Sequence, residues 1–432
     1  MTESKAGKGG QTVVIGLDGT PWSFLSKEME EGNLPHLAGI FSRGAFNRMT
    51  TEIPTISSVA WASFMTGRNP GEHGIYGFTD RKPGTYDLYF PNYSHLKSEP
   101  LWETLGRKGK RCCVLNVPST YPARPLNGVL VSGFVAPDLA RATYPVEALE
   151  YLEKSGYRID VDAAKGRESL DLLIDDLHET MERRRDAILH FWNQEAWDLF
   201  VAVFTGTDRL HHFMWRHYDE GDGVYSREFL HYYRRLDEII GEFAAGLPEE
   251  TSLFMLSDHG FCSIRSEVYL NYFLREMGYL SLREGRAVTI ADMDPAGTRA
   301  YCMDPGRVYV NLQGREPGGT VPESAYDAVL DELTEALLGI TDPETGERVV
   351  ATVHRRDELF HGPLLESAPD LVAMPAQGYD IKGAIGRPKG LDRGHLTGMH
   401  THDDAFWYAS PGAGATVSHI REAAAVIAGQ VS

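Results

Sequence analysis

The stretch TVVIGLDG (residues 12–19) shows the pattern on which the fold prediction rests. Its six residues 12–17 are all apolar or β-branched, and such a continuous run predicts a strand that is buried on both faces. Asp18 and Gly19 follow directly and are typical of a turn. The same pattern predicts four more buried strands, at RCCVLNV (111–117), GVLVSG (128–133), LFVAVFT (199–205) and SLFML (252–256).

Long helical segments alternate with these strands. Residues 169–194 and 227–247 carry apolar side chains at positions i, i+3, i+4 and i+7, which is the pattern of amphipathic helices. Alternation of buried strands with helices predicts an α/β fold, with a central mostly parallel sheet flanked by helices on both faces.

The pattern changes between residues 262 and 385. Short strand-like pieces such as RVYVNL (307–312), a helix near 323–338 and turns rich in Gly and Pro replace the long helices. We predict a single catalytic domain over residues 1–432, in which 262–385 contain a smaller inserted α+β lobe. The apolar run PDLVAM (369–374) is expected to rejoin the main sheet.

Composition limits the classes of partner. The 432 residues hold 42 Lys and Arg against 61 Asp and Glu, which gives a net charge of −19. Such acidity argues against a nucleic-acid polymer or an anionic membrane as partner, and it leaves a small phosphorylated substrate open. We find no segment of signal-peptide type and no apolar run near the ~20 residues that span a bilayer. The four cysteines fit neither a disulfide framework nor a zinc ribbon. We therefore expect a cytoplasmic protein, and its oligomeric state stays open.

Carboxylates and imidazoles follow three of the predicted strands. Asp18 follows the first strand, Asp208 and His212 follow the strand at 199–205, and the adjacent Asp258 and His259 follow the one at 252–256. Each is common in turns and helix starts when taken alone. Ligands of a doubly wound sheet, however, bind beyond the carboxyl ends of its strands, where these side chains converge.

A loop near the C-terminus adds more imidazoles, because GHLTGMHTHDD (394–404) contains His395, His400 and His402. Mixed Asp and His sets suit zinc or another divalent metal that prefers nitrogen and oxygen ligands. Six such ligands and a hydroxyl are enough for two metal ions that share a site. Two ions placed in this way stabilise the attacking and leaving oxygens of a displacement at phosphorus.

The hydroxyl is expected from PTISSVAWASFMTGRNPGEHGI (54–75). Ser57 and Ser58 stand at the start of a predicted helix, where serine also serves as an ordinary cap. The free N–H groups of a helix start favour an anion, and a metal ion would turn a serine hydroxyl into a nucleophile at neutral pH. We therefore predict that Ser57 reacts and that the amide of Ser58 holds a phosphoryl oxygen.

These segments resemble a known family. GLDG, the serine stretch, TDRLHH, SDHG and GMHTHDD are similar, in this order, to the metal and nucleophile motifs of the alkaline phosphatase superfamily. The resemblance is greatest to the type I phosphodiesterase/nucleotide pyrophosphatase branch and its bacterial predicted phosphohydrolase/phosphomutase relatives, and it covers nearly the whole chain. The fold it implies is alkaline phosphatase-like.

The resemblance also implies roles for single residues. It implies two divalent metal ions, with Zn²⁺ expected and Mn²⁺ as the alternative. The family nucleophile stands ten residues before the Gly that ends its helix, and counting back from Gly67 reaches Ser57. The implied ligands are Asp18, Ser57, Asp258 and His259 for one ion, and Asp208, His212 and His400 for the other.

One position departs from the family pattern. Nucleotide pyrophosphatases carry an Asn three residues after the nucleophile, and this chain has Ala60 there. Besides Ser58, Arg209 and His395 are expected to bind substrate, and His211 and His402 stay open as further metal ligands. We expect a two-metal phosphohydrolase that cleaves phosphodiester or pyrophosphate bonds of nucleotide-like small molecules. The alternatives are a phosphomonoesterase or phosphomutase with the same site, or a catalytically silent binding protein.

Overall fold

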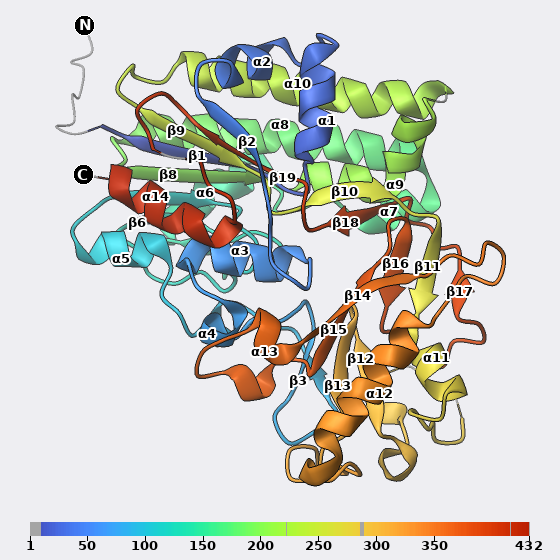
Figure 1. Ribbon diagram of the computed structural model, residues 1–432. Coiled ribbons are helices and arrows are strands. Elements are labelled where there is room, and N and C mark those ends of the chain that lie inside the picture. The colour runs from blue at the N-terminus through green and yellow to red at the C-terminus, as the bar shows by residue number, and fades with distance from the viewer. Residues whose placement is uncertain (1–9, 222, 286–288, 415, 432) are drawn as a thin grey trace, which may run out of the picture. The chain divides into compact units, whose positions relative to one another are not determined.

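The computed structural model describes residues 10–221, 223–285, 289–414 and 416–431. The chain forms two compact units. Unit 1 takes its described residues from Met1–Arg68, Asn92–Phe261 and Leu396–Ser432, and unit 2 takes them from Asn69–Pro91 and Cys262–His395. Each unit therefore combines segments that are far apart in the sequence (Figure 1).

An eight-stranded sheet forms the centre of unit 1 (Figure 1). In spatial order its strands are β2 (Ala45–Met49), β19 (Ala405–Ala409), β9 (Ser252–Leu256), β1 (Thr12–Leu17), β8 (Leu199–Phe204), β5 (Cys112–Leu115), β6 (Gly128–Val131) and β7 (Thr143–Tyr144).

The five strands predicted from the sequence are the five central strands of this sheet. β1 pairs in parallel with β8 and with β9, and β5 pairs in parallel with β6 and with β8. Only the outer pairs are antiparallel, with β19 between β2 and β9 and with β7 beside β6. The predicted α/β fold with a mostly parallel central sheet is confirmed.

Helices cover both faces of the sheet, as predicted. Val13, Ile15 and Leu17 of β1 alternate along the strand and pack into one apolar core with side chains of α8 (Leu170–Gln194) and α10 (Gly223–Ala245). The helices α3 (Ser57–Thr66), α5 (Leu101–Arg107) and α14 (Ala423–Gln430) lie on the opposite face (Figure 1). The remaining helices of unit 1 are α1 (Trp22–Glu30), α2 (Pro35–Phe41), α6 (Glu147–Ser155), α7 (Ala163–Glu168) and α9 (Gly206–Glu220).

Unit 2 has its own small sheets and its own apolar core. A four-stranded antiparallel sheet has the order β12 (Ala300–Met303), β13 (Arg307–Val310), β15 (Leu371–Pro375) and β14 (Val350–Arg355), and α12 (Tyr326–Leu338) packs on it. A three-stranded sheet has the order β16 (Tyr379–Lys382), β11 (Ser266–Tyr269) and β17 (Leu391–Asp392). Shorter elements are α4 (Pro70–His73), β3 (Asp80–Arg81), β4 (Leu88–Tyr89), α11 (Leu270–Glu276) and α13 (Arg356–Leu359).

One predicted strand joins a different sheet. Residues 369–374 were expected in the main sheet, but β15 pairs with β13 and β14 of unit 2, so this expectation was wrong. An apolar run predicts that a strand is buried and carries no information about which sheet it enters. Unit 2 also includes Asn69–Pro91, a segment that lies far from 262–385 in the sequence.

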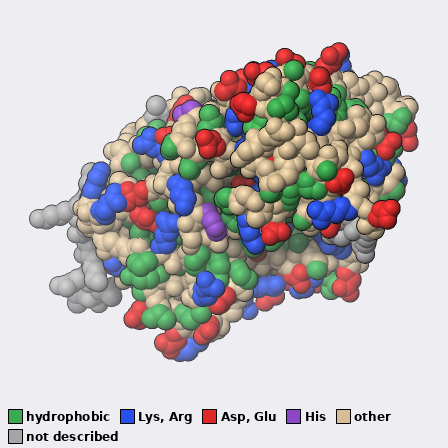
Figure 2. Space-filling model, turned by 90° about the horizontal axis from the view of Figure 1, so that it is seen from below, with side chains coloured by type: hydrophobic (Ala, Val, Ile, Leu, Met, Phe, Trp, Pro, Cys, Tyr) green, Lys and Arg blue, Asp and Glu red, His purple; other side chains and the backbone are tan. Residues whose placement is uncertain are grey.

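Charged side chains are spread over the surface. On the face that Figure 2 shows, Lys and Arg are interspersed with Asp and Glu, so the net charge of −19 is not gathered into one acidic patch there. Among the described residues, no helix has the length and apolar character needed to cross a bilayer.

Candidate active site

All seven predicted metal ligands lie in unit 1, in one cluster at the carboxyl ends of β1, β8 and β9. Asp18 follows β1, Asp208 lies in the first turn of α9 after β8, and Asp258 and His259 follow β9. His400 comes from the short strand β18 (Gly398–Thr401), which belongs to the C-terminal segment of unit 1. Because β8, β1 and β9 are neighbours in the sheet, the side chains that follow them meet at one edge.

The first half of the cluster surrounds the hydroxyl of Ser57. The Ser57 Oγ atom lies 3.4 Å from Asp18 Oδ1 and 3.2 Å from His259 Nε2. His259 Nε2 is 3.3 Å from Asp258 Oδ2. Asp18, Asp258 and His259 form a group whose ligand atoms all lie within 4.8 Å of one another.

The second half surrounds Asp208. Its Oδ1 atom lies 3.2 Å from His400 Nε2 and 3.4 Å from His212 Nε2, and the two Nε2 atoms are 3.0 Å apart. Asp208, His259 and His400 form a second group with ligand atoms within 4.8 Å. His259 belongs to both groups, so the two halves are continuous.

The backbone sets the tautomer of all three histidines. The Nδ1 atoms of His212, His259 and His400 lie 3.0, 3.1 and 3.3 Å from the carbonyl oxygens of Gly398, Gly260 and Thr55. A carbonyl oxygen only accepts hydrogen bonds, so each Nδ1 carries the proton and donates it. Each ring therefore directs Nε2 toward the cluster, and Nε2 is the atom through which a neutral ring with its proton on Nδ1 binds a metal ion.

With Nε2 unprotonated, each short contact between a carboxylate oxygen and an Nε2 atom brings together two hydrogen-bond acceptors, with no hydrogen bond between them. Asp208 Oδ1 and Asp258 Oδ2 are buried and have no hydrogen-bond donor among the residues that the structure describes. Burial of such oxygens costs free energy unless a proton or a cation compensates them. This donor set fits divalent metal ions.

The pKa values of the carboxylates also depend on their burial and on the charges close to them. Burial, together with the nearby charges of Asp258 and Asp208, raises the pKa of Asp18 well above its usual value. Burial also raises the pKa of Asp258 to about 7, and Asp208 contributes to that shift. Burial would also raise the pKa of Asp208, but His212, His400 and Arg209 outweigh burial and lower it well below its usual value. The unfavourable burial of negative charge therefore falls on Asp18 and Asp258 when no cation is bound.

Main-chain and side-chain donors hold the ligands in place. The N–H of Gly19 donates to Asp258 Oδ1 at 2.8 Å, and Trp61 Nε1 donates to Asp18 Oδ2 at 2.9 Å. Gly19 has φ +67°, and a Cβ atom there would lie 2.8 Å from the Phe261 ring, so the turn requires glycine. Sequence reasoning missed the contact of Trp61, because a buried tryptophan in a helix looks like ordinary core.

Ser57 is the first residue of α3, as predicted. The first N–H groups of a helix have no acceptor within it, so the amides of Ser57 and Ser58 are available to an anion. The Ser58 side chain is buried, and its Oγ has no hydrogen-bond partner among the described residues.

Arg209 holds Asp208 instead of extending freely. Its Nε and Nη2 donate to Asp160 Oδ2 at 3.1 and 2.7 Å, and its Nη1 donates to Asp208 Oδ2 at 3.3 Å. The guanidinium also lies over the Phe134 ring, 4.2 Å from its centroid. Burial lowers the pKa of Arg209, but Asp160 and Asp208 outweigh burial and raise it above its usual value.

The other histidines differ from the three ligand candidates. His211 is fully buried, with Nδ1 3.0 Å from the Gly19 carbonyl and Nε2 2.7 Å from the Tyr233 hydroxyl, so both nitrogens are engaged. Burial lowers its pKa to about 3. His402 lies outside both ligand groups. His395 is exposed and belongs to unit 2, and its role in substrate binding stays a prediction.

Comparison with known proteins gives a consistent result. The profile of the family described as type I phosphodiesterase/nucleotide pyrophosphatase matches residues 12–403. No curated protein sequence matches the chain.

Several solved structures share the fold. Phosphonoacetate hydrolase from Sinorhizobium meliloti, solved with phosphonoacetate, is similar with a TM-score of 0.67 and 16% identity, over 98% of this chain and 96% of the other. Murine ectonucleotide pyrophosphatase/phosphodiesterase 5 is similar with a TM-score of 0.60 and 15% identity, over 98% and 95%. An inactive form of the murine protein was solved with AMP.

Proposed function

Because this chain belongs to the type I phosphodiesterase/nucleotide pyrophosphatase family and is a phosphoric ester hydrolase of a metal-dependent superfamily, we propose that Ser57 is its nucleophile. The substrates we propose are small nucleotide-like molecules that contain a phosphodiester or pyrophosphate bond. The observation that carries the proposal is the position of the Ser57 hydroxyl, 3.2 Å from His259 Nε2 and 3.4 Å from Asp18 Oδ1.

The ligand atoms support a site for two divalent ions. Asp18, Ser57, Asp258 and His259 surround one position, and Asp208, His212 and His400 surround the other. Nitrogen and carboxylate ligands favour Zn²⁺, with Mn²⁺ as the alternative. When bound, the ions would lower the pKa of the serine hydroxyl and stabilise the negative charge that develops on the phosphoryl group.

His259 alone does not explain activation of the serine. Burial, with a further contribution from His400, holds the pKa of His259 well below its usual value. Its Nδ1 faces a carbonyl oxygen and not a carboxylate, so His259 lacks the carboxylate at Nδ1 that orients and stabilises the histidine of a Ser–His–Asp triad. A Ser–His pair without further help would therefore provide a weak base, which supports metal activation of the serine.

The chain contributes a nucleophile and an oxyanion site. Ser57 Oγ attacks phosphorus and forms a phosphoserine ester, while the bond from phosphorus to the leaving oxygen breaks. The amides at the start of α3 are oriented to donate to a non-bridging oxygen of the phosphoryl group. Water then hydrolyses the ester and restores Ser57.

Arg209 supports the proposed substrate class. A phosphate monoester carries more negative charge than a diester, and its oxygens need additional donors. Arg209 is the basic residue nearest to the ligands in the sequence, and Asp160 and Asp208 already engage its guanidinium. We infer that Arg209 positions Asp208, and that the site favours the less charged diester or pyrophosphate group.

A second candidate is a phosphomonoesterase or phosphomutase that uses the same nucleophile. Ala60, where nucleotide pyrophosphatases carry Asn, is the observation that favours it. The alternative of a catalytically silent binding protein is not supported, because the chain belongs to a family of phosphoric ester hydrolases and all seven ligand positions are filled.

Turnover of matched substrates tests the proposal. One preparation, supplied with Zn²⁺ and separately with Mn²⁺, is assayed with an aryl phosphate monoester, an alkyl diester with the same aryl leaving group, and a dinucleotide. We expect a higher kcat/KM for the diester than for the monoester. A hundredfold preference for the monoester would overturn the substrate class and favour the second candidate. Absence of turnover with every substrate and both metals would overturn the proposed substrate class and metals.

We also propose that the enzyme acts in the cytoplasm. Cys112, Cys113, Cys262 and Cys302 are all buried and form no disulfide, as expected in a reducing compartment. Fractionation of cells that express the tagged full chain tests this proposal, and recovery in the medium or periplasm would contradict it.

A further inference from the structure

A second group of metal-ligand side chains lies outside the active site, where α8 and α10 pack together. It consists of His178 from α8 and of Glu228 and His231 from α10. One ligand atom from each residue lies within 4.8 Å of the ligand atoms of the other two. We call these three residues the interhelical cluster.

The helix geometry brings the donors together. Glu228 and His231 are three residues apart and therefore lie on the same face of α10, with His231 Nδ1 3.7 Å from Glu228 Oε2. His178 approaches from α8, and the two imidazole rings have centroids 5.2 Å apart and are tilted by 55°. The His178 ring also packs edge-on against Tyr232 at 5.5 Å, which fixes its position.

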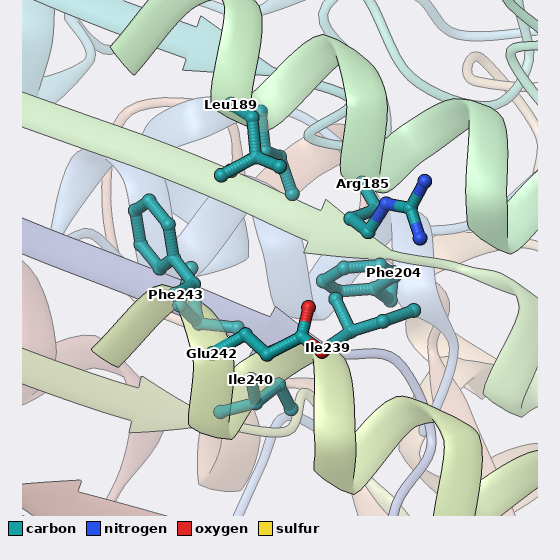
Figure 3. Close-up of a pocket in the computed structure, with 9 residues that line it drawn as sticks. Arg185, Leu189, Phe204, Ile239, Ile240, Glu242 and Phe243 are labelled. Atoms are coloured by element: carbon teal, nitrogen blue, oxygen red, sulfur yellow. The ribbon is translucent and has the colours of Figure 1, made fainter. Parts of the chain in front are cut away.

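The packing of the two helices continues beyond the interhelical cluster. Arg235 Nε donates to Glu182 Oε1 at 2.6 Å, about one turn further along both helices. Beyond this ion pair, Leu189 of α8 and Phe243 of α10 face each other across an apolar pocket (Figure 3). The backbone that follows the cluster on both helices is therefore held by contacts that do not involve its three donors.

The donors of the interhelical cluster are uncommitted. Among the residues that the structure describes, neither imidazole makes a hydrogen bond, and no Lys or Arg pairs with Glu228. His190, also on α8, differs because its Nε2 contacts the side-chain amide of Gln194 at 2.8 Å. The His231 side chain is 65% exposed, so an ion can reach the cluster from solvent.

We propose that the interhelical cluster binds one divalent transition-metal ion, with Zn²⁺ as the best match. Two imidazoles and one carboxylate form a ligand set found at zinc sites with an open fourth position, which water would occupy. The Glu-x-x-His spacing along α10 is also used for metal binding inside helical bundles. The ion would join α8 to α10 and so stabilise this face of unit 1.

Metal counting tests the proposal. The full chain, loaded with its active-site metals, is titrated with Zn²⁺ at pH 7.5 by calorimetry, and bound zinc is counted after dialysis. We expect wild type to bind one equivalent more than His231→Ala or His178→Ala. Zn²⁺ should also raise the melting temperature of wild type more than that of either variant. The matched control His190→Ala, on the same helix, should keep the additional equivalent.

The Gln variants address loss of folding. His178→Gln and His231→Gln keep side-chain volume and remove the imidazole, so a folded variant that lacks the additional equivalent supports the proposal. Equal stoichiometry and equal affinity in wild type and in both Gln variants would overturn it. The outcome is independent of catalysis, because none of these residues lies in the active site.

Discussion

Two buried carboxylates, one in each unit, have the same exposure and opposite surroundings. Asp258 in unit 1 and Asp370 in unit 2 are both completely buried. Asp370 accepts hydrogen bonds from Arg315 Nη1 and Nη2 at 2.7 and 2.6 Å, from the Tyr326 hydroxyl at 2.5 Å and from the Val310 N–H at 2.7 Å. Asp258 accepts one from the Gly19 N–H, and its Oδ2 has no donor among the described residues.

The difference shows that burial alone does not identify a functional carboxylate. Asp370 has donors for both oxygens and a cationic partner, so its role is structural. Asp258 lies beside Asp18 and Asp208, and its pKa is raised to about 7 mainly by burial. The negative charges around Asp258 are therefore not compensated by the protein, and a divalent ion would supply the positive charge.

The largest effect is expected at the hydroxyl that the unit 1 carboxylates surround. Ser57→Ala removes the nucleophile and one metal ligand, and we expect it to lower kcat by about a thousandfold or more. Ser58→Ala should cost far less, since its proposed contact is through the backbone. Steady-state turnover of an aryl diester measures both. Equal losses would show that the wrong serine was chosen.

The next largest effect is expected on metal removal, because only Asp258 is a proposed metal ligand and Asp370 is not. With metal bound, Asp258→Asn should lose ions from its half of the cluster and lower activity by about a hundredfold. After chelation, the same variant should melt at a higher temperature than chelated wild type, because it has one less buried charge among like charges. Metal analysis measures the loss of ions. Thermal melting with and without chelator measures whether the difference in melting temperature between the variant and wild type depends on the metal. Near-normal activity and unchanged metal content in the variant would contradict the ligand assignment.

Asp370 should behave differently in the same experiments. Asp370→Asn neutralises the buried carboxylate that pairs with the partly buried Arg315, and we expect a loss of about 3 kcal/mol in the free energy of unfolding. Chelator should leave this loss unchanged. The control Asp331→Asn, at the mostly exposed pair with Arg355, should cost only about 0–1 kcal/mol. Denaturant titration measures the free energy of unfolding of both variants. If the loss in Asp370→Asn depended on the chelator, Asp370 would not differ from Asp258 as proposed.

The smallest effect concerns Glu52, which has a cationic partner as Asp370 does and a raised pKa as Asp258 does. It pairs with Arg421 Nε at 2.8 Å, and burial raises its pKa from 4.5 to about 7. The folded state therefore holds this proton more tightly than the unfolded state does. The resulting stability is complete below pH 4.5 and is lost as the pH rises through 7.

The variant Glu52→Gln isolates this contribution. In wild type this group should make the free energy of unfolding fall by about 3 kcal/mol between pH 4.5 and 7, and the variant should lack this fall. Chemical denaturation at several pH values measures the slope. An unchanged slope would show that Arg421 already keeps Glu52 charged in the folded state.

The sequence predicted those parts of the fold and site that depend on local pattern. The central strands were predictable because strands covered on both faces are continuous apolar runs. The choice of Ser57 over Ser58 rests on the family resemblance, through the count back from Gly67, and stays a prediction. Contacts between distant segments were not predictable. Trp61 donates to Asp18, and Asp160 engages Arg209, through tertiary packing that no local pattern encodes. The sheet that β15 joins depends on pairing, which is likewise set by tertiary structure.

The C-terminal segment of unit 1 has a consequence for maturation on the ribosome. His400 and β19 both come after the whole of unit 2 in the chain, and β19 separates β2 from β9 in the sheet. A nascent chain that has emerged only to residue 395 therefore has six of the seven ligands, and β2 has no neighbouring strand. Domains fold as units during synthesis, so the ligand cluster is completed only after the whole of unit 2 has been translated. Partly made chains would thus be inactive toward phosphorylated metabolites.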